Sequence, residues 1–137
     1  MTQMTTDLLL TSPADDYMNA AQIDYFKGLL QRERIKLLEQ LSTPAAEPED
    51  PSSYPDPVDR ASMEEERAQT IRDRCRVEAR IVEIDRALKR IADDDGYGYC
   101  IETGDPIGIG RLLIQPTATL CVEAQARCEH VKRAQRF

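Results

Sequence analysis

Tryptophan is absent from the 137-residue chain, and aromatic residues make up only 5% of it. Glycine is also scarce, with six residues. Because strands favour aromatic and β-branched side chains, this composition disfavours a sheet sandwich, and the 31% of charged residues favours solvated helices. No apolar run approaches the roughly 20 residues that span a bilayer, so no membrane contact is expected.

No secretory signal is expected from the first residues, and the chain has no excess of positive charge. Residues 1–15 have neither a basic start nor a sustained apolar core. The formal net charge of -7 disfavours a non-specific grip on DNA phosphates, which requires a basic surface. These observations predict a cytoplasmic protein that acts on another protein.

Closely paired cysteines are missing too. The cysteines are Cys75, Cys100, Cys121 and Cys128, and without an export signal disulfides are not expected. A structural zinc site takes its ligands in closely spaced pairs. Thr103 and Ala124 stand where partners of Cys100 and Cys121 would be, and neither side chain replaces a thiolate. A four-ligand zinc site is therefore not predicted there.

One alternative ligand set remains open, namely Cys100, Cys121, Cys128 and His130. Cys128 and His130 lie two positions apart in a predicted helix, so their side chains point in different directions. Otherwise Cys75 and Cys128 are interpreted as small apolar residues on helices.

A first amphipathic helix is predicted from residue 19. Asn19 and Gln22 have the spacing of a capping box, and an apolar seam follows: Ile23, Phe26, Leu30, Leu37 and Leu41. The polar Glu33 occupies an interrupted position of this seam. Pro44 ends the helix.

A second, longer helix follows a Pro-rich loop at residues 43–55. Asp56 and Pro57 predict its start, Gly96 marks its end, and its heptad seam contains Val77, Ile81, Ile84, Leu88 and Ile91. Helices with matching seams and a short connection pack antiparallel. The predicted fold class is therefore mainly α, a long antiparallel helical coiled coil.

Beyond residue 96 the pattern changes to that of a small base. Tyrosines and isoleucines alternate with other residues on both sides of a turn at 103–106, which predicts a short β-hairpin. Pro116 and Thr117 predict the start of a last helix with an apolar stripe of Leu120, Ala124, Cys128 and Val131.

We therefore expect a monomer with three parts. Residues 1–18 are an N-terminal segment that packs on the base or is disordered. Residues 19–95 are the helical hairpin, with its tip loop at 43–58. Residues 96–137 are the small globular base with a C-terminal helix.

Charge is uneven along the predicted hairpin. Between residues 47 and 66 there are eight acidic side chains and a single basic one, Arg60. Such an acidic tip can enter a deep channel and approach a metal ion or a basic loop. Asp56 and Asp59 also have a purely structural explanation, because a cap and a charge at a helix N-terminus stabilise the helix.

Two motifs resemble the DksA/TraR family. Residues 54–61, Tyr-Pro-Asp-Pro-Val-Asp-Arg-Ala, followed by three glutamates at 64–66, resemble the tip signature of that family. Residues 98–112 and 116–121 resemble its zinc-finger segment. The resemblance covers roughly residues 19–128.

The resemblance implies a bacterial transcription factor that binds RNA polymerase and has no sequence-specific contact with promoter DNA. In this family the coiled coil enters the secondary channel and destabilises the open promoter complex, as at ribosomal RNA promoters in the stringent response. The tip residues that carry this activity match Asp56, Asp59 and Ala61. No enzymatic activity is expected.

The same resemblance identifies four finger positions, which are Cys100, Thr103, Cys121 and Ala124. With two cysteines instead of four, the chain is similar to zinc-independent members of the family, and no zinc cofactor is expected. The base must then be held by packing, for which the candidates are Tyr97, Tyr99, Ile107, Ile109, Leu112 and Leu120.

The family's base also offers basic side chains to the alarmone ppGpp at the polymerase interface. Arg76 and Arg111 are basic at matching positions, so ppGpp is expected as a co-effector. The other matching positions carry no positive charge that could pair with a phosphate; they are Glu83, Gln115 and Gln125. The synergy with ppGpp is therefore left open.

Three rival functions remain. A Gre-type transcript-cleavage factor projects an acidic coiled-coil tip into the same channel. A thiol redox switch would use Cys100 and Cys121, which the finger positions place close together. A plain coiled-coil adaptor would not need its acidic tip.

Overall fold

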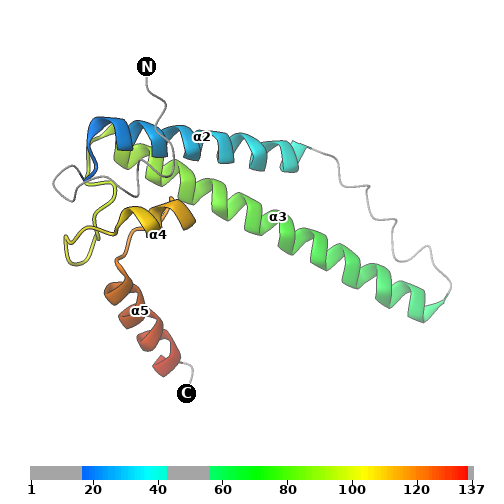
Figure 1. Cartoon of the computed structure of the whole chain (residues 1–137). Helices are drawn as coiled ribbons and strands as arrows, with labels where there is room; N and C mark the ends of the chain where they lie inside the picture. Colours follow the sequence, from blue (N-terminus) through cyan, green and yellow to red (C-terminus); the bar gives the residue numbers. More distant parts are fainter. Residues whose placement is uncertain (1–16, 43–55, 136–137) are drawn as a thin grey trace. The chain divides into compact units, whose positions relative to one another are not determined.

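The computed structural model describes residues 17–42 and 56–135. They form four helices, which are α2 (Ala20–Ser42), α3 (Pro57–Ala92), α4 (Ile109–Ile114) and α5 (Val122–Gln135) (Figure 1). The predicted mainly α fold class is confirmed. Within these two ranges no helix combines the length and the apolar character needed to span a membrane.

The chain divides into two compact units. Of the described residues, one unit combines 17–31 with 84–135, and the other combines 32–42 with 56–83. In each unit a part of α2 lies beside an antiparallel part of α3 (Figure 1). The predicted antiparallel pairing of the two long helices is thus present within each unit.

The start of α2 is capped as its sequence predicts. Asn19 Oδ1 accepts a hydrogen bond from the Gln22 backbone N–H at 2.9 Å. In return Gln22 Oε1 accepts one from the Met18 N–H at 2.6 Å, one residue before the usual position. Because Gln22 is fully buried, this reciprocal pair also attaches Met18 and Asn19 to the unit.

The helical seams are buried in both units. In the first unit Phe26, Leu30 and Ile84 are completely buried, and the ring of Tyr97 lies 6.1 Å from that of Phe26. In the second unit Leu37 and Ile81 are buried. The period of three and four residues is therefore the spacing at which each helix meets its neighbour.

The polar interruption of the seam has a partner in the second unit. Glu33 Oε1 accepts hydrogen bonds from Arg80 Nε at 2.9 Å and from Arg80 Nη2 at 2.6 Å. Near the end of α2, Arg74 Nη2 donates to the Leu41 carbonyl at 3.2 Å. Arginines of α3 thus satisfy polar groups of α2.

The predicted β-hairpin is wrong in the part of the chain described. A single antiparallel bridge joins Tyr99 to Pro106, and it is flanked by bonds from the Cys100 N–H to the Asp105 carbonyl and from the Ile107 N–H to the Gly98 carbonyl. Pro106 has no N–H to extend a ladder. The chain then turns through Gly108, at φ 106°, into α4.

The predicted start of the last helix is also wrong. The helix α5 begins at Val122 and not at Pro116. The short helix α4 ends at Ile114, and a turn that contains Pro116 joins it to α5. The Pro116 carbonyl accepts a hydrogen bond from the buried Tyr97 hydroxyl at 2.7 Å. Because this carbonyl is held by a distant side chain, Pro116 serves as an anchor for the base.

Replacement of Phe26 should test the seam. Phe26→Ala removes a completely buried ring and is expected to lower the free energy of unfolding by about 3–5 kcal/mol. Ile35→Ala, at an apolar position of the same helix that is 56% exposed, should change it by less than about 0.5 kcal/mol. Urea denaturation of both variants measures the difference, and equal losses would contradict the assigned seam.

Candidate functional site

The first turn of α3 holds the described part of the predicted tip. Asp56 Oδ1 accepts a hydrogen bond from the Val58 N–H at 2.9 Å, and its carbonyl accepts one from the Arg60 N–H at 3.0 Å. Asp56 is therefore the N-cap that its sequence context predicts. Residues 43–55 of the tip loop lie outside the described residues.

The other two predicted tip residues are exposed. Asp59 lies in the first turn of α3, and Ala61 follows it on the same helix. A carboxylate here is stabilised by the positive end of the helix dipole. This turn therefore presents negative charge to solvent beside a small side chain, an arrangement that suits contact with a cation or a basic loop.

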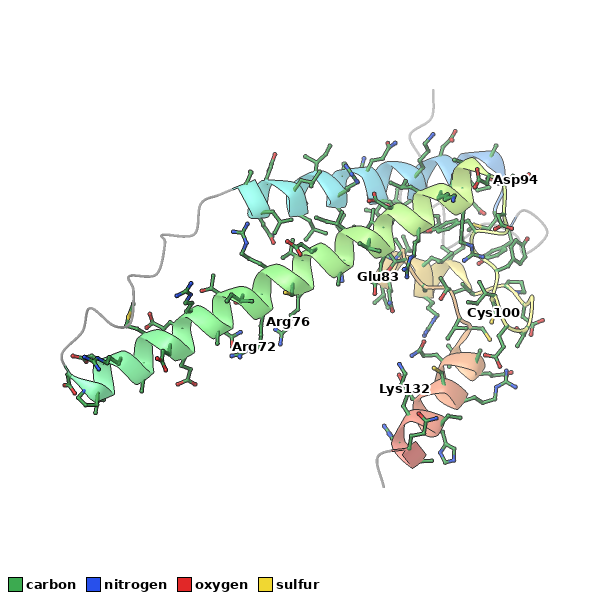
Figure 2. The ribbon with its side chains drawn as sticks, turned by 180° about the vertical axis from the view of Figure 1, so that it is seen from behind. Arg72, Arg76, Glu83, Asp94, Cys100 and Lys132 are labelled. Carbon is green, nitrogen blue, oxygen red and sulfur yellow. The ribbon has the colours of Figure 1, made fainter. Side chains whose placement is uncertain are left out.

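Arginine side chains project from the middle of α3. Figure 2 shows Arg72 and Arg76 on one side of the helix, four residues apart. Arg76 is 76% exposed and lies 3.7 Å from Asp73, while Arg72 donates to Gln69 at 2.8 Å. Neighbours on the same helix thus hold both guanidinium groups, which remain accessible to an anionic partner.

Arg111 has a structural partner in the first unit. Its Nε donates to the Leu120 carbonyl at 3.1 Å, and the residue is half-buried. Arg76 belongs to the other unit. The two predicted ppGpp positions therefore differ, because Arg76 is an exposed cation and Arg111 braces α4 against the turn before α5.

The four finger positions lie in the first unit. Cys100 is buried, and its Sγ accepts the Thr103 N–H at 3.4 Å, while Thr103 Oγ1 lies 3.8 Å from Cys121 Sγ. Ala124 is completely buried near the start of α5. Thr103 therefore contacts both remaining thiols.

Opposing effects act on the Cys100 thiol. Burial raises its pKa, but the hydrogen bonds of the Thr103 side chain and the backbone N–H groups of Cys121, Thr103 and Glu102 together lower the pKa to about 6. Backbone amides that point at a sulfur stabilise a thiolate. The loop thus surrounds Cys100 with donors suited to a negatively charged sulfur.

These positions do not fit a tetrahedral zinc site. Such a site needs four nitrogen or thiolate ligands, and Thr103 and Ala124 supply neither. Across residues 17–42 and 56–135, no three His, Cys, Asp or Glu side chains converge as a metal site would require. The alternative set with Cys128 and His130 is therefore not assembled.

Hydrogen bonds from side chains to the backbone stabilise the base, in addition to the expected packing. The Tyr17 hydroxyl donates to the Gly98 carbonyl at 2.6 Å and accepts the Gly108 N–H at 2.9 Å. Arg90 Nη2 donates to the Gly96 carbonyl at 2.8 Å. Burial raises the pKa of Tyr17 and of Tyr97, so both hydroxyls remain protonated donors.

Tyr17 and Arg90 were not predicted from the sequence. Neither belongs to an apolar period or a motif, and Tyr17 acts on residues 81 and 91 positions away. Of the predicted packing residues, Tyr97, Ile107 and Leu112 are buried, and Tyr99 packs edge-on to Tyr17 at 5.4 Å. Contacts of this range have no local signal in the chain.

Comparison with known protein families identifies the family to which the chain belongs. The model of the DnaK suppressor protein DksA N-terminal domain matches residues 22–91, and that of the prokaryotic dksA/traR C4-type zinc finger matches residues 96–130. Together they describe a helical protein with a C-terminal finger. The chain belongs to the DksA family.

Individual relatives agree over most of the chain. It is 42% identical over 127 residues to the RNA polymerase-binding transcription factor DksA of Caulobacter vibrioides, covering 90% of this chain and 89% of that protein. The Escherichia coli K12 protein of the same name is 38% identical over 118 residues, covering 85% and 78%. The solved structure of transcription factor DksA2 from Pseudomonas aeruginosa has a TM-score of 0.78 and 43% identity, covering 93% and 98%.

Removal of the Tyr17 hydroxyl should weaken the base. Tyr17→Phe leaves the Gly98 carbonyl and the Gly108 N–H without their shared partner and should lower the free energy of unfolding by about 1–3 kcal/mol. Thr70→Val removes an exposed hydroxyl bonded within α3 and should cost less than about 0.5 kcal/mol. Chemical denaturation distinguishes them, and a Tyr17→Phe protein as stable as the parent would contradict the bracing role.

Alkaline pH should destabilise the protein through Tyr97. Because burial raises the pKa of Tyr97 in the folded state, the unfolded chain loses this proton first as the pH rises above about 10. The free energy of unfolding should therefore fall with pH in this range. Tyr97→Phe should show a shallower fall in denaturation series between pH 9 and 11, and identical slopes would contradict the assignment.

Proposed function

We propose that this chain binds RNA polymerase and regulates the initiation of transcription. The observation that supports the proposal best is the exposed first turn of α3, with Asp56, Asp59 and Ala61, within the region that matches the DksA N-terminal domain. The relatives described above are named as RNA polymerase-binding transcription factors. The chain acts by contact and makes or breaks no covalent bond.

The proposed mechanism places the tip carboxylates in the secondary channel of the polymerase. Asp56 shapes the turn through its cap, and Asp59 supplies an exposed charge that can act on a basic loop or a bound metal ion of the enzyme. Repulsion or competition at that point destabilises the open complex at promoters such as those of ribosomal RNA. The protein works as a cytoplasmic monomer without specific contacts to DNA.

Two finer points belong to the same proposal. The base functions without zinc, because two of its four finger positions are Thr103 and Ala124 and because side-chain hydrogen bonds from Tyr17, Arg90 and Tyr97 brace it. The alarmone ppGpp acts as a co-effector through Arg76 and Arg111, of which Arg76 has the more exposed guanidinium.

In vitro transcription from a ribosomal RNA promoter tests the tip. Asp59→Asn removes the charge and should raise the concentration needed for half-inhibition by roughly tenfold or more, which corresponds to about 1.4 kcal/mol or more. Asp56→Asn keeps a residue that caps equally well, so a loss of inhibition in this variant reports the charge alone. Glu78→Gln, an exposed change further along α3, should behave as the parent.

The assay is run in metal-free buffer with chelator, with and without ppGpp, and polymerase binding is measured in parallel. Inhibition that survives chelation supports independence from zinc. Equal inhibition by the parent and Asp59→Asn would reject Asp59 as the effector. Cleavage of a backtracked transcript would instead indicate a Gre-type factor, and binding without any effect would indicate an adaptor.

A further inference from the structure

The thiols of Cys100 and Cys121 share one neighbour, Thr103, at positions that lack the four ligands of a structural zinc site. Cys100 is only 3% exposed, and Cys121 is partly exposed. Thr103 lies between them, with its N–H 3.4 Å from Cys100 Sγ and its hydroxyl oxygen 3.8 Å from Cys121 Sγ. Figure 2 shows Cys100 within the loops of the base and not on a helix.

The surroundings hold both sulfurs in place. The Cys100 N–H and carbonyl bond to Asp105 and Gly104, and the Ile101 N–H bonds to the Thr119 carbonyl at 2.9 Å. The last bond joins the loop of Cys100 to the turn that leads into Cys121. The two thiols therefore belong to one closed backbone frame, although they are 21 positions apart in the chain.

The number of thiolate ligands at these positions determines which kind of metal ion they can hold. Zinc in structural sites takes four ligands, whereas soft monovalent ions with a filled d shell, such as Cu(I) and Ag(I), accept two thiolates in a linear arrangement. Thiolate ligands favour Cu(I) over hard cations. The replacement of two finger positions by Thr103 and the buried Ala124 removes the ligands that zinc needs and leaves the two that a monovalent ion needs.

We propose that Cys100 and Cys121 form a two-thiolate site for a monovalent thiophilic cation of the Cu(I) or Ag(I) type. The site is independent of the tip and of polymerase binding. Among the described residues, no third His, Cys, Asp or Glu side chain joins these two thiols in a group that could hold a metal ion.

The test uses the full chain with Cys75→Ser and Cys128→Ser as the parent. Ag(I) is titrated against thermal unfolding, and Cu(I) is supplied without oxygen in competition with a chromogenic chelator. We expect one ion per chain and a melting temperature that rises with ion concentration, as binding to the folded state requires. Zn²⁺ should produce neither effect.

Removal of either thiol should abolish the site. Cys121→Ser in the parent is expected to weaken Ag(I) and Cu(I) binding more than about 100-fold, beyond the roughly 10–100-fold typical of a lost outer partner. Cys100→Ser should do the same. Retained one-to-one binding in either variant, or equal retention of Zn²⁺ by the parent, would overturn the proposal.

A gain-of-function variant distinguishes a loss of metal binding from a loss of folding. Thr103→Cys combined with Ala124→Cys adds two thiols at the other finger positions and should shift the preference from Ag(I) toward Zn²⁺. If this variant binds Zn²⁺ while the folded parent, checked by circular dichroism, binds no Ag(I), the frame is correct and the two-thiolate site is refuted.

Discussion

The burial of apolar side chains where α2 and α3 meet, in the unit that carries the base, is the interaction on which the rest depends. Phe26, Leu30 and Ile84 are completely buried there, and each contributes about 1.5–3 kcal/mol. Their sum is comparable to the net stability of a small domain. The ring of Tyr97 packs against Phe26, and its hydroxyl holds the Pro116 carbonyl, so the helical core also orders the turn that precedes α5.

Hydrogen bonds from side chains to the backbone order the base. A metal held by four thiolates can supply much of the folding free energy of a small domain. In this base Tyr17, Arg90 and Arg111 donate to backbone carbonyls, and each such bond contributes about 0.5–1.5 kcal/mol. The amide of Thr103 still points at the Cys100 sulfur, so the loop keeps donors for a thiolate.

The start of α3 joins a structural and a proposed functional role in the same residues. Asp56 caps the helix, and Asp59 lies where the helix dipole stabilises negative charge. A charged tip can therefore be exposed without cost to the helix. Further along, Glu33 and Arg80 form a partly exposed ion pair that joins α2 to α3.

Local pattern determined the two long helices, α2 and α3, and their N-caps, because a period of three or four residues and a capping side chain act within one or two turns. The tip and finger positions are predictions from short motifs. Only the tertiary structure decided the single bridge at Tyr99, the start of α5 at Val122 and the bracing by Tyr17. Each of these depends on a partner outside the local turn or on a backbone group that already has a hydrogen bond or lacks an N–H. Such constraints arise from tertiary packing and leave no periodic pattern in the sequence.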